Sequence, residues 1–206
     1  MKQTGMGLVL GLGLLAGCSP IIVGPSQMSL QQIAVSPPMP LVAQKSPRPL
    51  YIVLDPARVP DVMPVLVNGV NQGGQMGNMH LFVVRDIQRA FASYFDHVSV
   101  VAPGQAPTSG DALIVDVRLD RLATVSQVIQ HRSWVEVMGR PSLNWAVGLR
   151  AANANEFIWS FAGSSQGDLT NNPQVMYQSL FEHAVMDMLK DYAQQHVQER
   201  LQAGQP

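Results

Sequence analysis

Strict alternation of apolar and polar residues in the second half of the chain constrains the fold more than any other feature. In the run DALIVDVRLDRLATV, residues 111–125, the apolar positions are Leu113, Val115, Val117 and Leu119, and the positions between them are Ile114, Asp116, Arg118 and Asp120. Successive side chains of a strand point to opposite faces. The run therefore predicts a strand with one buried face and one largely solvated face.

Two further runs alternate in the same way, SLNWAVGLRA (142–151) and FIWSFAG (157–163), and a short Asn-rich segment separates them. This arrangement predicts an antiparallel hairpin. Residues 126–140 are compatible with either a further strand or part of a long hairpin. Shorter apolar runs at 50–55 and 97–103 predict two more strands.

Two segments have the apolar spacing of amphipathic helices. The first is 79–95. The second starts at Pro173, where Asn172 is a suitable N-cap and proline suits the first turn. The Gly/Asn-rich segment 68–78 predicts a flexible loop. Together these elements predict an α+β fold, with an antiparallel sheet of about four to five strands and two amphipathic helices packed on one face.

Composition restricts the kinds of partner. The chain is 47% hydrophobic, which is enough for a sizeable core, and its formal net charge is −1. Without a basic excess it is not expected to bind nucleic acid. Residues 20–49 contain seven prolines, which favour an extended spacer. The stretch 29–35 in that spacer is apolar enough to order against a domain.

The N-terminus has the pattern of a secretory signal. Lys2 precedes an uncharged apolar stretch, residues 5–17, which is shorter than the roughly 20 residues that a transmembrane helix needs. Small residues follow, and then Cys18, the only cysteine of the chain. A single cysteine cannot form an intramolecular disulfide.

Leu15-Ala16-Gly17-Cys18 resembles the lipobox of bacterial lipoproteins. The resemblance implies cleavage before Cys18 and attachment of a diacylglycerol to its thiol, with fatty acyl groups such as palmitate as the anchor, since two or more chains give lasting membrane attachment. Ser19 after the cysteine implies transfer to the periplasmic face of the outer membrane. The expected organisation is a signal peptide (1–17), an acylated N-terminus and Pro-rich tether (18–49) and a periplasmic domain (50–206).

Catalytic and ligand-binding motifs are weak. The segment GSSQG (163–167) matches the G-x-S-x-G pattern around Ser165, but a nucleophile elbow needs a helix directly after the strand, and here the helix starts near Pro173. The five histidines have no metal-ligand spacing, and the glycines of 69–77 lack both phosphate-loop patterns. We therefore expect no catalytic residues, no cofactor and no metal site.

The layout from Leu50 to Tyr192 resembles the auxiliary lipoproteins of ABC-type lipid transport systems. The segments that carry the resemblance are residues 79–101, residues 111–125 and the closing helix 174–193. It implies a non-enzymatic accessory component of a transport or envelope-assembly machine, with a protein partner in the envelope. Residues 155–166 also resemble a strand of the outer-membrane lipoproteins that activate penicillin-binding proteins, which makes a peptidoglycan-synthase activator the alternative.

Three functions are therefore open: a transport or assembly accessory, a synthase activator, and a lipid-anchored hydrolase that uses Ser165. The solvated face of the sheet and exposed apolar residues of the helices are the two candidate surfaces for a partner. The sequence alone does not choose between these surfaces.

Overall fold

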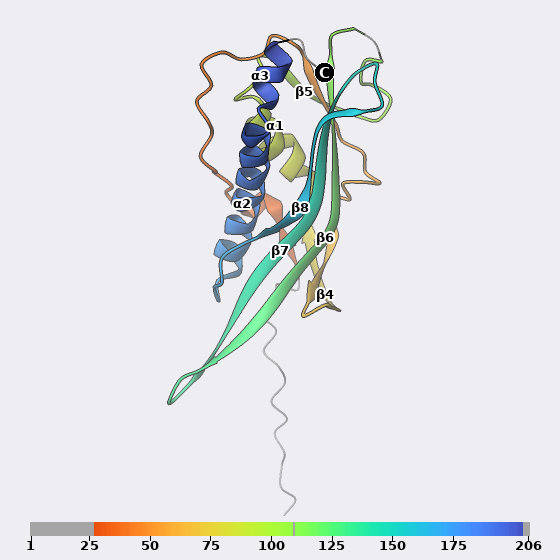
Figure 1. Cartoon of the computed structure of the whole chain (residues 1–206). Coiled ribbons are helices and arrows are strands. Elements are labelled where there is room, and N and C mark those ends of the chain that lie inside the picture. The colour runs from red at the N-terminus through yellow and green to blue at the C-terminus, as the bar shows by residue number, and fades with distance from the viewer. Residues whose placement is uncertain (1–26, 109, 204–206) are drawn as a thin grey trace, which may run out of the picture.

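The sheet is organised around one long strand, β6. In the computed structural model, which describes residues 27–108 and 110–203, β6 and its antiparallel partner form a hairpin that is much longer than the other strands (Figure 1). The strands are β1 (Met28–Ser29), β2 (Leu50–Val53), β3 (Met63–Val67), β4 (Val70–Gly77), β5 (Val98–Val101), β6 (Leu113–Gln130), β7 (Val135–Ala151) and β8 (Phe157–Gln166).

On its second edge, β6 is paired with two different strands in succession. Its first part is parallel to β2, which is in turn parallel to β5, and residues 122–124 are parallel to β3. Between the stretches of β6 that are paired with β2 and with β3, the loop after β2 lies beside β6. There the amide of Leu119 donates to the carbonyl of Arg58. The α+β class is confirmed, but the expected sheet of four to five antiparallel strands is wrong: the sheet is mixed and has eight strands. The parallel strands are short and largely apolar, so they do not show the alternation that identifies a half-buried antiparallel strand.

Residues 68–78, expected as a flexible loop, instead contain most of a β-hairpin. β3 and β4 are antiparallel and are joined by Asn68-Gly69, both with positive φ (51° and 83°). This is the turn geometry that Asn-Gly favours in two-residue hairpins, because it matches the twist of the flanking strands. The same finding explains why the glycines of this segment do not form a phosphate loop.

The helices lie together on one face of the sheet (Figure 1). They are η1 (Leu30–Gln32), η2 (Phe82–Ile87), α1 (Gln88–Phe91), α2 (Pro173–Gln194) and α3 (Val197–Gln202). The side chain of Asn172 caps α2 as expected, accepting from the amides of Gln174 and Val175. Among the described residues, no helix is both long and apolar enough to span a bilayer.

The first helical segment differs from a regular α-helix. Phe82–Ile87 has the wider turns of a π-helix, and Asp86 within it is buried. Its carboxylate accepts from the neighbouring Arg85 guanidinium at 2.7 and 3.0 Å. Burial nevertheless raises the pKa of Asp86, with Arg85 opposing the shift.

A single main core fills the space between the helices and the sheet. Trp145 on β7 and Phe181 on α2 both contact Phe82, with ring centroids 5.3 Å apart in each pair. Near the start of α2, the hydroxyl of Tyr177 is hydrogen-bonded to that of Thr124 on β6 at 2.9 Å. Burial raises the pKa of Tyr177 to about 12. This hydrogen bond lies where β6 leaves the part of the sheet that the helices cover.

Part of the expected tether is packed onto the domain. We name residues 27–49 the strap; Leu30, Ile33 and Val35 in it are buried in the main core. The strap then passes over the helical layer, where the amide of Ser36 donates to Glu182 of α2 and Lys45 donates to the carbonyl of Ala92. The local ordering allowed for 29–35 is thus observed, and residues 18–26 of the expected tether lie outside the described residues.

Replacing Ile33 by alanine should lower the free energy of unfolding by about 2–5 kcal/mol, because it leaves a cavity in the core beneath the strap. Urea denaturation of the purified protein measures the change. The control is Leu41→Ala, also in the strap but fully exposed, which should change stability by less than about 0.5 kcal/mol. Equal stability of both variants would mean that the strap is detached in solution.

Candidate functional site

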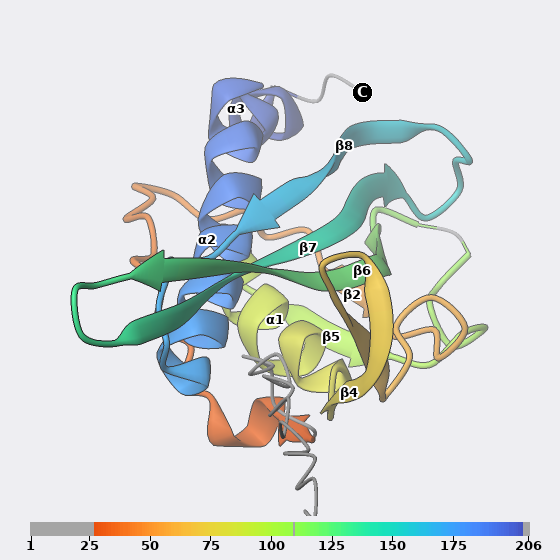
Figure 2. The ribbon, with the colours of Figure 1, turned by 90° about the horizontal axis from the view of Figure 1, so that it is seen from below.

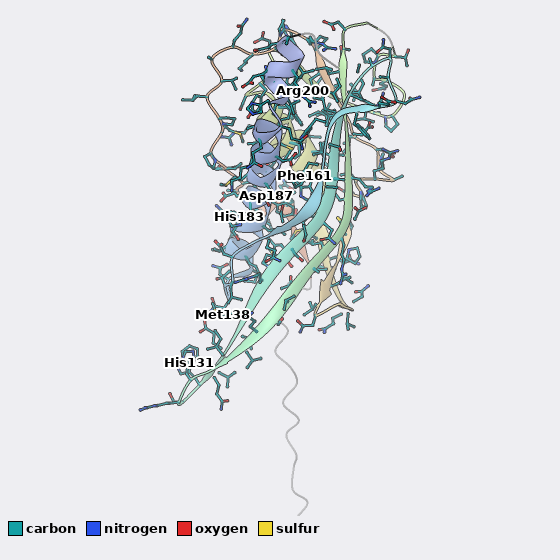
Figure 3. The ribbon with its side chains drawn as sticks, viewed as in Figure 1. His131, Met138, Phe161, His183, Asp187 and Arg200 are labelled. Atoms are coloured by element: carbon teal, nitrogen blue, oxygen red, sulfur yellow. The ribbon has the colours of Figure 1, made fainter. Side chains whose placement is uncertain are left out.

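Ser165, the candidate nucleophile, is inside the protein. It lies on β8 and is 1% exposed. Its hydroxyl donates to Asp187 Oδ2 on α2 at 2.7 Å and accepts from Trp145 Nε1 at 3.3 Å. His183, on the same helix (Figure 3), is bonded to the carbonyl of Gln166 rather than lying between Ser165 and Asp187.

This arrangement holds α2 against the sheet and does not form a nucleophile elbow. A second bond of the same kind joins Trp159 Nε1 to Asp191 at 2.7 Å, one helical turn after Asp187. The two aspartates thus accept hydrogen bonds from buried groups of β8. A hydroxyl that is buried against the sheet cannot meet a substrate, so the geometry does not support the hydrolase hypothesis.

The five histidines come from separate parts of the fold. Three of them are each near one acidic side chain: His80 near Asp61, His131 near Glu136 and His196 near Glu199. Within residues 27–108 and 110–203, no three His, Cys, Asp or Glu side chains are grouped as metal ligands would be. Cys18, the predicted lipidation site, lies outside the described residues.

The face of the sheet turned away from the helices carries a groove that we name the outer-face groove. Its volume is about 410 Å³, and its lining includes Arg58, Asp116, Arg118, Gly148, Phe157 and Ser160. The floor is formed by two rows of residues that cross the strands, and the members of these rows on β7 and β8 are small. One row is Asp116, Gly148 and Ser160, and the next is Arg118, Ala146 and Ala162.

Gly148 gives this floor its shape. The ring of Phe157 lies over it so closely that a Cβ at this position would be 2.4 Å from the nearest ring carbon. A register shift between β7 and β8 at Leu149/Arg150 sets Phe157 opposite Arg150. The phenyl ring is therefore supported by the sheet and is still 52% exposed. An exposed aromatic ring beside small residues is typical of a surface that receives a partner side chain.

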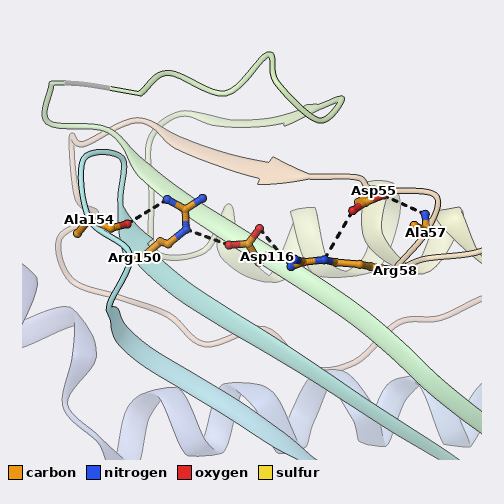
Figure 4. Close-up of polar contacts among 6 residues, drawn as sticks. All are labelled: Asp55, Ala57, Arg58, Asp116, Arg150 and Ala154. Atoms are coloured by element: carbon orange, nitrogen blue, oxygen red, sulfur yellow. Dashed lines mark hydrogen bonds and ion pairs between the residues drawn. The ribbon is translucent and has the colours of Figure 1, made fainter.

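Charged side chains line one side of the groove (Figure 4). Asp116 accepts from Arg150 Nε at 3.0 Å, and Arg150 also donates to the carbonyl of Ala154 at 3.1 Å. Arg58 is held more loosely, 3.9 Å from Asp116 and 3.6 Å from Asp55, and it is 55% exposed. Its guanidinium has donors left for a carboxylate or a carbonyl of a partner.

The loop that carries Arg58 is fixed at both ends. Asp55 Oδ1 accepts from the amide of Ala57, Val59 is buried in the core, and the carbonyl of Arg58 is bonded to β6. The solvated face around Asp116 and Arg118 was one of the two surfaces expected from the sequence. Arg58 and Phe157 were missed, because a loop and a register shift bring them there.

The other expected surface receives little support. Val175, at the start of α2, is the one large apolar side chain of the described helices that is substantially exposed. The strap covers part of the helical layer. The outer-face groove is therefore the better candidate for binding a partner.

Comparison with known proteins identifies the fold but no family. No protein-family model and no curated protein matches the sequence. Among solved structures, the chain is similar to a Xanthomonas campestris protein associated with the family model DUF330, with a TM-score of 0.51, 9% identity and coverage of 87% of this chain and 98% of the other. At that identity the similarity shows a shared fold and nothing about activity.

Two weaker similarities complete the comparison. One is to a Helicobacter pylori protein described as a homolog of a neuraminyllactose-binding hemagglutinin, with a TM-score of 0.49, 10% identity and coverage of 83% of this chain and 100% of the other. The second is to a lipoprotein from Neisseria meningitidis, with a TM-score of 0.34, 10% identity and coverage of 70% of this chain and 99% of the other. At these TM-scores neither carries an argument about this chain.

Ser165→Ala should lower the free energy of unfolding by about 1–3 kcal/mol, because it removes the donor to Asp187 and the acceptor for the Trp145 indole. Ser164→Ala, at the exposed neighbouring position of β8, is the matched control and should leave stability unchanged. Thermal or urea unfolding compares them. Labelling of the folded wild-type protein at Ser165 by a serine-reactive phosphonate would contradict the structural role.

Proposed function

We propose that this protein is a lipid-anchored, non-enzymatic envelope lipoprotein that acts as an accessory component of a transport or envelope-assembly machine. The signal pattern and the lipobox at Cys18 support the anchor, on the periplasmic face of the outer membrane. The observation that carries the accessory role is the outer-face groove: the helices cover one face of the sheet, and the other presents a shaped, partly charged surface.

The groove favours a protein partner over a small-molecule substrate. It is open to solvent, and the part of its floor on β7 and β8 consists of short side chains and backbone, with the charged groups to one side rather than converging around a closed cavity. Phe157 supplies a rigid aromatic contact, and Arg58 supplies a cation that retains free donors. A partner segment with an acidic and an apolar side chain would complement both residues.

Cys18→Ser should abolish acylation. The chain should then have no attached lipid, whether or not its signal peptide is cleaved. Metabolic labelling with a palmitate analogue, followed by membrane fractionation, measures both effects. Wild-type protein should take up the label and sediment with outer membranes, and Ser19→Ala is the matched control that keeps the thiol. Labelling that persists in Cys18→Ser would contradict the proposed anchor.

A photoreactive amino acid at Ser160 should crosslink to the partner in intact cells, whereas the same residue at Lys190, exposed on the helical layer, should not. The crosslinked protein is identified by mass spectrometry. Recovery of a permease or substrate-binding component of a transporter supports the accessory role. Recovery of a penicillin-binding protein supports the synthase-activator alternative instead.

A second variant tests whether the groove determines the interaction. Arg58→Glu combined with Phe157→Ala should weaken binding of the identified partner by about tenfold or more, since it reverses one charge and removes the exposed ring. Titration of the purified partner measures the affinity. Unchanged affinity, or equal crosslinking from Ser160 and Lys190, would contradict the proposed docking surface.

A further inference from the structure

The distal part of the β6–β7 hairpin leaves the rest of the domain. We name residues 125–140 the extension. Here β6 and β7 are paired with each other from Val125↔Arg140 to Gln130↔Val135, whereas the pairing of β3 with β6 ends at Thr124 and that of β8 with β7 ends at Ser142. Figure 2 shows the extension projecting well beyond the helices and the remaining strands. A two-stranded ribbon of this kind is only marginally stable in water by itself.

The base of the extension is held and its end is exposed. Ser126 donates its amide to Asn68, Gly139 is bridged to Thr170, and Glu136 accepts from Asn171. Beyond these bonds, Val128 is 70% exposed, Val135 is 56% exposed and Trp134 is 52% exposed. At the tip, the rings of Trp134 and His131 are stacked with centroids 3.8 Å apart (His131 is labelled in Figure 3).

The tip has the composition of a membrane-interface contact. Tryptophan is enriched where the headgroups meet the hydrocarbon, and exposed valines beside it supply apolar area. Arg132 and Arg140 are exposed and can bind lipid phosphates, while Glu136, the one acidic residue of this segment, is near His131 and Asn171.

The direction of the chain brings the extension to the predicted anchor. β1 is parallel to β4, β4 is antiparallel to β3, and β3 is parallel to β6, so the chain enters β1 from the side of the extension. Met28 is level with Met63, and therefore with residues near 120 of β6. From that level to Gln130 is ten residues of strand, or about 33 Å.

The chain limits the distance between the predicted anchor and β1. Met28 is ten positions after Cys18, and a chain of that length spans at most about 36 Å in any conformation. The extension is therefore about as long as the greatest reach of the acylated N-terminus. In Figure 1 it points toward the end of the domain at which the described chain begins.

We infer that the tip of the extension, Val128 to Val135, is a second membrane contact, inserted into the interface of the leaflet that holds the lipid anchor. This inference rests on the anchor at Cys18 that the proposed function includes. Two contacts would fix the orientation of the domain on the membrane, which a single contact would not. The outer-face groove would then face along the membrane surface rather than toward it.

The tryptophans offer a direct test. Trp145 and Trp159 are 1% and 2% exposed, so Trp134 is the accessible one. Acylated full-length protein is reconstituted into phosphatidylethanolamine–phosphatidylglycerol vesicles that carry brominated acyl chains. Bromolipid should quench and blue-shift the Trp134 emission and should protect it from aqueous acrylamide. Trp134→Phe should remove the quenching.

A matched pair of variants separates insertion from anchoring. Val128→Asp combined with Val135→Asp should abolish bromolipid quenching while the acylated protein still floats with vesicles, and Leu41→Asp, at an exposed apolar position in the strap, should retain both.

Wild-type protein that floats with vesicles but has unquenched Trp134 overturns the inference and leaves the anchor intact. Wild-type protein that does not float contradicts the proposed anchor instead. Acrylamide protection without bromolipid quenching would assign the tip to a contact with a second copy of the chain and would also overturn the inference.

Discussion

The pairing of β6 with β7 is the constraint on which the rest of the structure depends. The two strands stay paired from Leu113↔Ala151 to Gln130↔Val135, with one register shift near residue 120. Every other strand is joined to this pair directly or through one neighbour, or in the case of β1 through two. Because side chains alternate along a strand, this single register also decides which residues face the helices and which form the outer-face groove.

The groove exists because the two faces of the β6–β7 pair have different residues. On the covered face, Leu143, Trp145 and Val147 fill the core. On the other face, the positions between them are Asn144, Ala146 and Gly148, which are too small to build a second hydrophobic layer. Within the part of the chain that the structure describes, a small cluster around Ile114 and Ala152 is buried on that side. The outer face therefore stays solvated over most of β7 and β8, and the aromatic ring that lies there is held by packing on a glycine.

The alternation in β6, β7 and β8 and the capped helix α2 could be predicted from the sequence, because their signals are local. The strap could be predicted only in part, since its burial depends on α2 and η2, which come much later in the chain. The β3–β4 hairpin was missed although Asn68-Gly69 is a strong hairpin signal, because the nearby prolines and glycines suggested a loop. In the groove, Asp116 and Arg118 follow from alternation. Arg58 and Phe157 depend on a loop that joins two parallel strands and on a register shift, which no local pattern encodes.

The length of β6 and β7 beyond the core also needs a physical reason. Core packing explains the pair up to Thr124, where Tyr177 provides the last contact from α2. Past that point the extension buries little, yet it retains valines, an isoleucine and a tryptophan, which favour strands but are costly to leave in water. The bonds at its base join the extension to the turn between β3 and β4 and to the segment before α2. An apolar projection held in this way is suited to setting the position of the groove relative to another surface.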